Sequence, residues 1–540
     1  MLYAHFRSRC VGLNFVPALL IVAAGLLAQA QVSITTYHYD TYRTGWNSQE
    51  TVLTPTVVHG SSFGVLNTIT LDDQVDAQPL IVANINITAG NYQGVHTAVY
   101  VATENNSIYA IDTTSGAVLL QANLGPTVVN PVGCGKSGDV GINSTPVIDL
   151  SSNTLYTMSY TQQSSGPAYY LHALNLGNLT DNVAPQLVTA SHTLTNGKTY
   201  AFNPEYQRQR PALLMADGNI YAAFGSFCDQ HPNLSRGWIL GWQTGSLTPL
   251  PSNMLTDTQG TDTDSYFLSS IWMSGYGPSA DDDGNILFVT ANSDPDEDTY
   301  DGVTNIQESV IQLSSDLSTV LDLFTPSDVF DLDQHDSDFG SGGVMVLPDQ
   351  PGSVPYLAVA AGKNGSMFFM NEQNLGGFST TGNNVLGTYT VGPCWCGPSY
   401  FVDPKDGAGR VVSSGGSAVR VWKVVTGASS PTLTQVTASP ELSSAGSGFF
   451  TSVSSNGTTN PIIWALSRPK ASQTSVDLYA FSPDIGGTTM KQLYEGMVGT
   501  WELGAGNTNL IPVVANGEVF VASYKELVIL GLTTKAGNSK

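Results

Sequence analysis

Two arginines that stand two positions apart are the clearest candidates for binding chemistry. They occur in Gln207-Arg208-Gln209-Arg210-Pro211, in a chain with only 19 Lys and Arg residues against 43 Asp and Glu. Alternate residues of a strand point to the same side, so Arg208 and Arg210 can present both guanidinium groups to one carboxylate or sulfate. The pair indicates an anion site. The alternative is that the arginines pair with structural carboxylates such as Asp338.

Aromatic and polar side chains at comparable positions extend this candidate site. Most of them stand just before an apolar segment that predicts a strand, and together they would offer ring faces, amides and cations to an anionic sugar. The predicted ligand-binding residues are Gln78, Asn143, Arg208, Arg210, Trp272, Tyr276, Asp338, Trp395 and Asn509.

An acidic loop is the candidate metal site. Its candidate ligands are Asp294, Asp296, Asp298 and Asp301. Their spacing begins like a calcium-binding EF-hand loop, which uses oxygen ligands at alternate positions. Thr299 replaces the glycine of the sixth position, and Asn305 stands where a glutamate is expected. A solvated acidic loop is the alternative interpretation.

No motif identifies a catalytic centre. The chain has no Gly-x-Ser-x-Gly elbow, His-Glu-x-x-His pair or phosphate-binding loop. His231 and His335 stand near carboxylates and are candidate general bases, as is Tyr276. The alternative for both histidines is an ordinary loop residue with satisfied hydrogen bonds.

The cysteines and the N-terminus predict an exported protein. Residues 1–30 combine Arg7 and Arg9, an apolar stretch and an Ala-Gln-Ala cleavage signature, which is typical of a secretory signal peptide. An uncleaved anchor is the alternative. Four cysteines follow, an even number that suggests disulfides in an oxidising compartment. We predict that Cys134 pairs with Cys228, while Cys394 and Cys396 form a tight ring or stay reduced.

Charge excludes two classes of partner. The net charge is −24, and only 11% of the residues are charged. An acidic surface repels phosphate backbones and anionic lipids, so neither nucleic acid nor a membrane surface is expected as a partner. No apolar stretch after residue 30 approaches the roughly 20 residues that cross a bilayer.

Internal repeats must position all these side chains. A polar residue or glycine, in most cases followed by proline, precedes apolar strand hairpins at 79, 146, 211, 278, 343, 398, 453 and 512. Val99–Asp112 shows the hairpin most clearly, because two alternating apolar strands flank Asn105-Asn106-Ser107.

These units predict an all-β fold, a single β-propeller over residues 31–535. We expect eight blades, with seven as the alternative, each a four-stranded antiparallel sheet. Closing the ring requires a strand from the other end of the chain. We expect that strand near Thr35 to His38, paired with the residues that end at Leu532.

The repeats resemble those of the quinoprotein (PQQ-type) β-propeller proteins, secreted bacterial proteins, over about residues 35–532. The segments that carry the resemblance are Val99–Gly116, Tyr37–Asn47, Val132–Gly135, Gln209–Leu214, Asp336–Gly343 and Ala361–Gly365. In quinoprotein dehydrogenases the resemblance implies PQQ stacked on a tryptophan, bound Ca²⁺ and two adjacent cysteines. Here the cysteines stand in Cys394-Trp395-Cys396, and no Cys-x-x-Cys-His haem motif occurs.

The sequence favours a secreted, non-redox module that binds or scaffolds an extracellular glycan, other polymer or protein. Two alternatives remain open. The first is a PQQ- and Ca²⁺-dependent dehydrogenase. The second is a polysaccharide lyase or hydrolase that acts on uronates at the propeller mouth, with Tyr276, His231 or His335 as the base.

Overall fold

The computed structural model describes residues 31–533, apart from 135–137, 261–264, 428–429, 471, 484–486 and 503–508. The predicted signal peptide, residues 1–30, lies outside the described residues. Val32–Lys540 forms one compact unit. Within the described ranges no helix has the length and apolar character of a membrane span.

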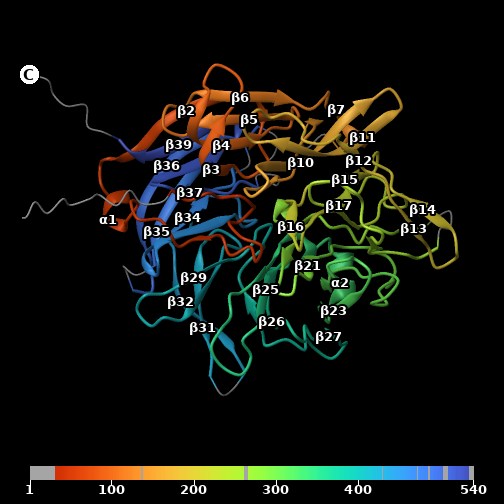
Figure 1. The fold of residues 1–540 in the computed structure, drawn as a ribbon. Coiled ribbons are helices and arrows are strands. Elements are labelled where there is room, and N and C mark those ends of the chain that lie inside the picture. Colours follow the sequence, from red (N-terminus) through yellow and green to blue (C-terminus); the bar gives the residue numbers. More distant parts are fainter. Residues whose placement is uncertain are drawn as a thin grey trace, which may run out of the picture. The chain divides into compact units, whose positions relative to one another are not determined.

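Eight antiparallel sheets follow one another around a ring, from orange at the top of Figure 1 through green to blue. This arrangement confirms the predicted eight-bladed propeller of small antiparallel sheets. The first four blades are β3 (Leu80–Ile87), β4 (Gly94–Ala102), β5 (Ser107–Asp112) and β6 (Val118–Asn123); β9 (Val147–Asp149), β10 (Thr154–Gln163), β11 (Gly166–Asn175) and β12 (Gln186–Leu187); β16 (Leu214–Ala216), β17 (Asn219–Ser226), β18 (Trp238–Gln243) and β19 (Met254–Leu255); and β20 (Ser279–Ala280), β21 (Ile286–Val289), β22 (Val310–Leu313) and β23 (Val320–Thr325). The other four are β24 (Val344–Val346), β25 (Leu357–Ala361), β26 (Ser366–Asn371) and β28 (Gly387–Thr390); β29 (Ser399–Val402), β30 (Gly409–Ser413), β31 (Arg420–Val425) and β32 (Thr432–Ala438); β33 (Thr451–Asn456), β34 (Thr459–Leu466), β35 (Ser475–Ser482) and β36 (Lys491–Thr500); and β37 (Val513–Ala515), β38 (Glu518–Ala522), β39 (Tyr524–Leu532) and β2 (Phe63–Gln74).

Short elements connect or extend the blades. These are β1 (Trp46–Asn47), β7 (Val128–Val129), β8 (Asp139–Val140), β13 (Ser191–Thr193), β14 (Thr199–Ala201), β15 (Gln207–Arg208), β27 (Gly377–Phe378), the helices α1 (Pro55–Val58) and α2 (Val329–Gln334), and the 3-10 turns η1 (Pro131–Gly133), η2 (Met273–Gly275) and η3 (Phe339–Ser341).

The strand given first for each blade above, called the inner strand, begins close to the position that the sequence predicts. The largest departure is β16, which begins at Leu214 rather than at Pro211. Two of the inner strands, β24 and β37, have three residues each, and all of these residues are apolar and buried on both faces of the strand. Proline fits before inner strands because it lacks the N–H that a ladder hydrogen bond needs.

The ring closes through a different strand from the one expected. We predicted Thr35 to His38, but Phe63–Gln74 (β2) pairs antiparallel with Tyr524–Leu532 (β39). The prediction was wrong because the residues near Thr35 lie among the inner strands. The fourth strand of the last blade is instead supplied by β2, whose 12 residues are long enough to cover β39.

Residues 32–50, here called the N-terminal segment, contact all eight blades. The backbone of this segment pairs with β3 through Ile34 and with β33 through Trp46. Its carbonyl oxygens or side chains bond the other blades at Ile148, Leu213, Ala280, Val346, Tyr400 and Val514. The segment therefore occupies the middle of the ring, where the inner strands converge.

A tyrosine fills the interior beside this segment. The Tyr276 hydroxyl donates to the carbonyl oxygens of Arg43 at 2.8 Å and Pro398 at 3.1 Å. A Cβ atom at either Gly343 or Gly397 would overlap its ring. Two glycines on neighbouring blades thus leave the space that the ring occupies, and Tyr276 has no exposed surface.

Candidate functional site

The mouth is the end of the ring at which the inner strands begin. In an antiparallel blade the turn between the second and third strands lies at the same end. The mouth therefore gathers residues from two sets of loops. Asn143, Trp272 and Trp395 precede inner strands, whereas Lys363 follows β25 and Arg468 follows β34.

Arg208 takes part in a buried polar cluster on one side of the mouth. Its Nε donates to Asn143 Oδ1 at 2.9 Å, and its Nη2 lies 3.9 Å from Glu104 Oε1. Asn143 donates to both Glu104 and Asp76, and Gln74 also donates to both carboxylates. Burial raises the pKa of Asp76 and Glu104, and Asp76 adds to the effect on Glu104. Arg208 thus offsets the charge of buried carboxyl groups, as the alternative interpretation expected, although the partner is Glu104 and not the example given, Asp338.

Three arginines come close together beside this cluster. Burial, and after it the charge of Arg208, lowers the pKa of Arg210 to about 10. Burial, and after it the charge of Arg210, lowers the pKa of Arg468 to about 9. The carboxyl groups of Asp76 and Glu104 act on the pKa of Arg210 in the opposite direction. The three arginines therefore lie near one another and near two buried carboxyl groups.

Lys363 lies between two tryptophans. Its Nζ is 5.8 Å from the ring centres of both Trp272 and Trp395, within the range of cation–π attraction. The same ammonium donates to Asp336 at 2.8 Å and to Asp338 at 3.2 Å. Both rings are half-buried, so part of each indole surface remains open to a ligand.

Trp395 also joins Lys363 to the arginines. Its carbonyl oxygen accepts a hydrogen bond from Arg468, which donates to Asn509 Oδ1 at 2.8 Å as well. Cys394 and Cys396 form a disulfide on either side of it, which fixes the loop that carries the indole. The Trp395 Nε1 is buried and has no hydrogen-bond partner among the described residues. A buried donor without a partner is a position where a ligand acceptor would be stabilised.

Buried carboxyl groups line the blades beneath Lys363. Burial raises the pKa of Asp338 and of Asp333 to about 7, and it raises the pKa of Glu308 well above its usual value. For Asp338 the Lys363 charge opposes this effect. A carboxyl group that titrates near neutrality can accept or release a proton, so Asp338 can serve acid–base chemistry.

Two predicted ligand-binding residues lie in the interior instead. Gln78 accepts the backbone N–H of His38 at 2.8 Å and donates to the Thr36 carbonyl at 3.1 Å, so it binds the N-terminal segment. Burial raises the pKa of Tyr276 well above its usual value, and its hydroxyl serves backbone carbonyls. A phenol in that state is a poor general base.

No described interaction joins either candidate histidine to Lys363, although Asp336, next to His335, accepts a hydrogen bond from that lysine. His335 follows α2, is 66% exposed and pairs with Asp331 at 3.3 Å. His231 lies in the loop between β17 and β18, with its ring 5.0 Å from that of Tyr206. Neither histidine has a contact with the tryptophans or the arginines of the mouth among the described interactions.

In the acidic loop between β21 and β22, aspartate side chains accept hydrogen bonds from backbone N–H groups of the same loop. Asp301 accepts the N–H groups of Val303, Thr304 and Asn305, and Asp294 accepts that of Asp296. The described residues include no group of three or more His, Cys, Asp or Glu side chains arranged to hold a metal ion. This statement covers the four candidate ligands of the loop, Asp294, Asp296, Asp298 and Asp301.

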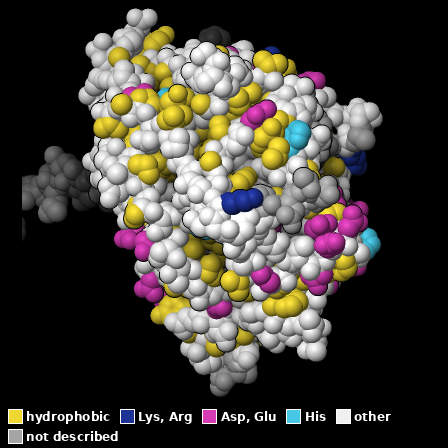
Figure 2. All heavy atoms as spheres, turned by 90° about the vertical axis from the view of Figure 1, so that its right-hand side faces the viewer, with side chains coloured by type: hydrophobic (Ala, Val, Ile, Leu, Met, Phe, Trp, Pro, Cys, Tyr) yellow, Lys and Arg dark blue, Asp and Glu magenta, His cyan; other side chains and the backbone are white. Residues whose placement is uncertain are grey.

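The second disulfide confirms a sequence prediction. Cys134 is bonded to Cys228, which joins the loop before β9 to the loop after β17 across two neighbouring blades. Figure 2 shows few Lys and Arg side chains on the face that it presents, among more numerous Asp and Glu side chains.

Sequence reasoning missed three residues of the mouth. Lys363, Arg468 and Glu104 stand in turns between the second and third strands, whereas the prediction considered only the loops that enter inner strands. The same hairpin spacing that predicted the blades could have located these turns.

Comparisons with known proteins support the fold. No family model and no curated protein matches the chain. Among solved structures it is similar to the quinohemoprotein alcohol dehydrogenase of Comamonas testosteroni, at 11% identity and a TM-score of 0.60 over 93% of this chain and 81% of that one. Alcohol dehydrogenase ADHIIG of Pseudomonas putida HK5 gives 11% and 0.61 over the same shares. A europium-containing methanol dehydrogenase gives 10% and 0.59 over 93% of this chain and 98% of that one. The chain has the PQQ-type propeller fold.

Proposed function

We propose that the chain is a binding module whose mouth holds a ligand with a flat ring and at least one carboxylate. The observation that carries this proposal is the position of the Lys363 ammonium, 5.8 Å from both Trp272 and Trp395. Arg468 extends the positive charge beyond Trp395, to which it is hydrogen-bonded. Indole faces stack on rings, and ammonium and guanidinium groups bind carboxylates.

Two classes of ligand share this chemistry. Uronate-containing glycans carry a carboxylate on each acidic sugar ring, and PQQ is a flat ring system with carboxylates. The structural relatives are named as a quinohemoprotein and as a europium-containing enzyme. PQQ is therefore a candidate ligand on the basis of fold as well as charge.

The residues do not fit a complex of PQQ with Ca²⁺. Calcium takes six to eight oxygen ligands, several of them carboxylates. At the mouth the carboxyl oxygens of Asp76 and Glu104 already accept hydrogen bonds from Asn143 and Gln74. Glu104 also lies 3.9 Å from the Arg208 guanidinium. The described residues provide no group of three or more His, Cys, Asp or Glu side chains that could hold a metal ion. We therefore derive no redox step and favour binding without catalysis.

Lyase or hydrolase activity has less support from the positions of the candidate bases. Tyr276 lies inside the ring, and His335 is exposed on the loop after α2. Asp338 is the better placed proton acceptor, because it touches Lys363. If an acidic glycan is cleaved, Asp338 is the first residue to replace in a test for the catalytic base.

Calorimetric titration tests the proposal. We expect oligogalacturonate or PQQ to bind in EDTA, a neutral galactose oligomer not to bind, and Lys363→Met to weaken binding about tenfold or more. Lys198→Met, at an exposed position outside the mouth, is the matched control. Equal binding by wild type and Lys363→Met would refute the proposal. Dye reduction after addition of PQQ, Ca²⁺ and an alcohol would instead favour the dehydrogenase.

We infer export of the protein from its N-terminus and disulfides. Structural disulfides persist in oxidising compartments, and Cys134–Cys228 and Cys394–Cys396 are both formed. An extracellular glycan or protein is then the expected class of partner. N-terminal sequencing of the secreted protein should read from Gln31, and recovery of an intact N-terminus in the cytoplasm would contradict export.

A further inference from the structure

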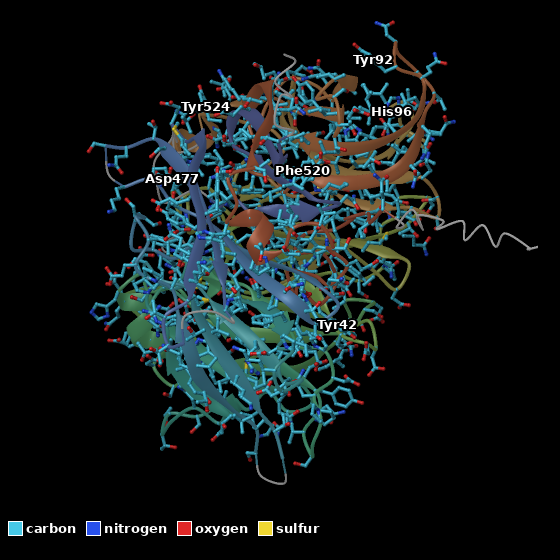
Figure 3. The ribbon with its side chains drawn as sticks, turned by 90° about the vertical axis from the view of Figure 1, so that its left-hand side faces the viewer. Tyr42, Tyr92, His96, Asp477, Phe520 and Tyr524 are labelled. Atoms are coloured by element: carbon cyan, nitrogen blue, oxygen red, sulfur yellow. A yellow bond between two sulfur atoms is a disulfide. The ribbon has the colours of Figure 1, made fainter. Side chains whose placement is uncertain are left out.

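A second candidate site lies at the end of the ring opposite the mouth. A cavity of about 300 Å³ opens between the fourth and fifth blades, beside the turn that follows β20. The inner strand β20 begins at the mouth, so this turn, which ends it, marks the opposite face. Tyr42 of the N-terminal segment also lines the cavity; Figure 3 labels this side chain, far from Tyr92 and His96 of the first blade.

The charge of this cavity is entirely negative. Asp282, Asp283 and Asp349 are exposed at its rim, while Asp281 and Glu372 are buried in its floor. No Lys or Arg side chain lines it. Carboxylates on a surface are usually solvated and have no ligand. The two buried carboxyl groups distinguish this cavity from such a surface.

The two buried carboxyl groups differ in their partners. Asp281 accepts four hydrogen bonds at 2.8 to 3.0 Å, from Asp283, Asn285 and Gln312. Glu372 is 8% exposed, and its carboxyl interacts with the side chain of Asp281.

Burial, and after it the charges of Asp281, Asp282 and Asp283, raises the pKa of Glu372 to about 8. A buried acceptor that faces another carboxylate needs either a proton or a cation. A cation could reach Glu372, because this residue lines the cavity directly.

From this geometry we propose that the cavity binds an organic cation that carries primary ammonium or guanidinium groups, one of which reaches Glu372. The five carboxyl groups of the lining do not include a group of three that could hold a metal ion, nor do the other described residues. Several separated ammonium groups match such a lining better than one metal ion. The rings of Tyr42 and Tyr356 add aromatic surface beside the cations.

Calorimetric titration with spermidine at about pH 8.5 tests this site. We expect one binding event, weakened about tenfold or more by Glu372→Gln and more modestly by Asp349→Asn at the rim. Asp316→Asn is the matched control, because that carboxylate is exposed on a neighbouring turn and does not line the cavity. Asp349→Asn keeps the test valid if Glu372→Gln does not fold.

Two results would overturn the proposal. The first is equal spermidine affinity in wild type, Glu372→Gln and Asp349→Asn, which would show only attraction to an acidic surface. The second is Ca²⁺ binding that Glu372→Gln abolishes, without spermidine binding, which would make the cavity a metal site. Because the cavity and the mouth lie at opposite ends, either result leaves the carboxylate ligand of the mouth to be judged separately.

Discussion

The imidazole Nε2 of His38 lies 2.8 Å from the backbone carbonyl oxygen of Thr451, which stands 413 positions later in the chain. Nδ1 of the same ring lies 2.6 Å from the Arg43 carbonyl oxygen. Burial lowers the pKa of His38 to about 4, so the ring is neutral at ordinary pH. A neutral ring has a single N–H and donates to only one of these two carbonyl oxygens. The N-terminal segment thus contacts the seventh blade as well as the first.

Gln78→Ala should lower the free energy of unfolding by about 2 to 4 kcal/mol, because it removes two buried hydrogen bonds to the N-terminal segment. Gln93→Ala, at an exposed position, should change it by less than about 0.5 kcal/mol. Urea denaturation measures both. Equal stability of the two variants would show that the segment contributes little.

Gly343→Ala should cost about 1 to 3 kcal/mol, because the added methyl group would overlap the ring of Tyr276. Gly446→Ala is the control, since no atom lies within 4 Å of a Cβ atom built there. Thermal unfolding should separate the two variants by about 1 to 3 °C, because the unfolding entropy of so long a chain is about 1 kcal/mol/K. A melting temperature for Gly343→Ala that matches the control would mean that Tyr276 packs differently.

The two disulfides should differ in their contribution to stability. Cys134 and Cys228 are 94 positions apart, so replacing both with serine should cost about 2 to 5 kcal/mol. Cys394 and Cys396 are two apart, and their replacement should cost less than about 2 kcal/mol, because the closed loop is short. Unfolding in urea measures both, and the reverse order would contradict this reasoning.

Glu372→Gln should be stabilising at high pH. The pKa of Glu372 rises from 4.5 to about 8 on folding, so the folded state retains a proton that the unfolded chain loses between those values. Wild-type stability therefore falls as pH rises through this window. Near pH 4.5 the two proteins should be similar, and by pH 8 the variant should be more stable by a few kcal/mol, on the order that linkage allows. A constant difference across the range would argue against a buried carboxyl group.

The inner strands could be predicted because their signal is local. A turn residue or proline followed by buried apolar residues marks most of the strand starts. This local pattern recurs from one blade to the next. The same signal led to Asn143, Arg208, Trp272 and Trp395, which precede inner strands at the mouth.

Other features depend on contacts that no local pattern records. Residues 32–50 bond the backbones of all eight blades, and their own sequence does not specify these partners. Tyr276 was expected beside Trp272, four positions earlier, but positive φ angles at Met273 and Ser274 turn the chain between them. Only the glycines of two later blades reveal the space that its ring occupies.

The pairing of Val32 with Asn516, 484 positions away, also constrains how the chain folds. Contacts of such high sequence separation form late, because a long loop must close before they can form. The N-terminal segment cannot make its contacts with the last blade until that blade has been synthesised. A ribosome-bound chain that lacks the last blade therefore cannot form the complete ring. Chaperones that hold extended chains would meet this protein before its interior exists.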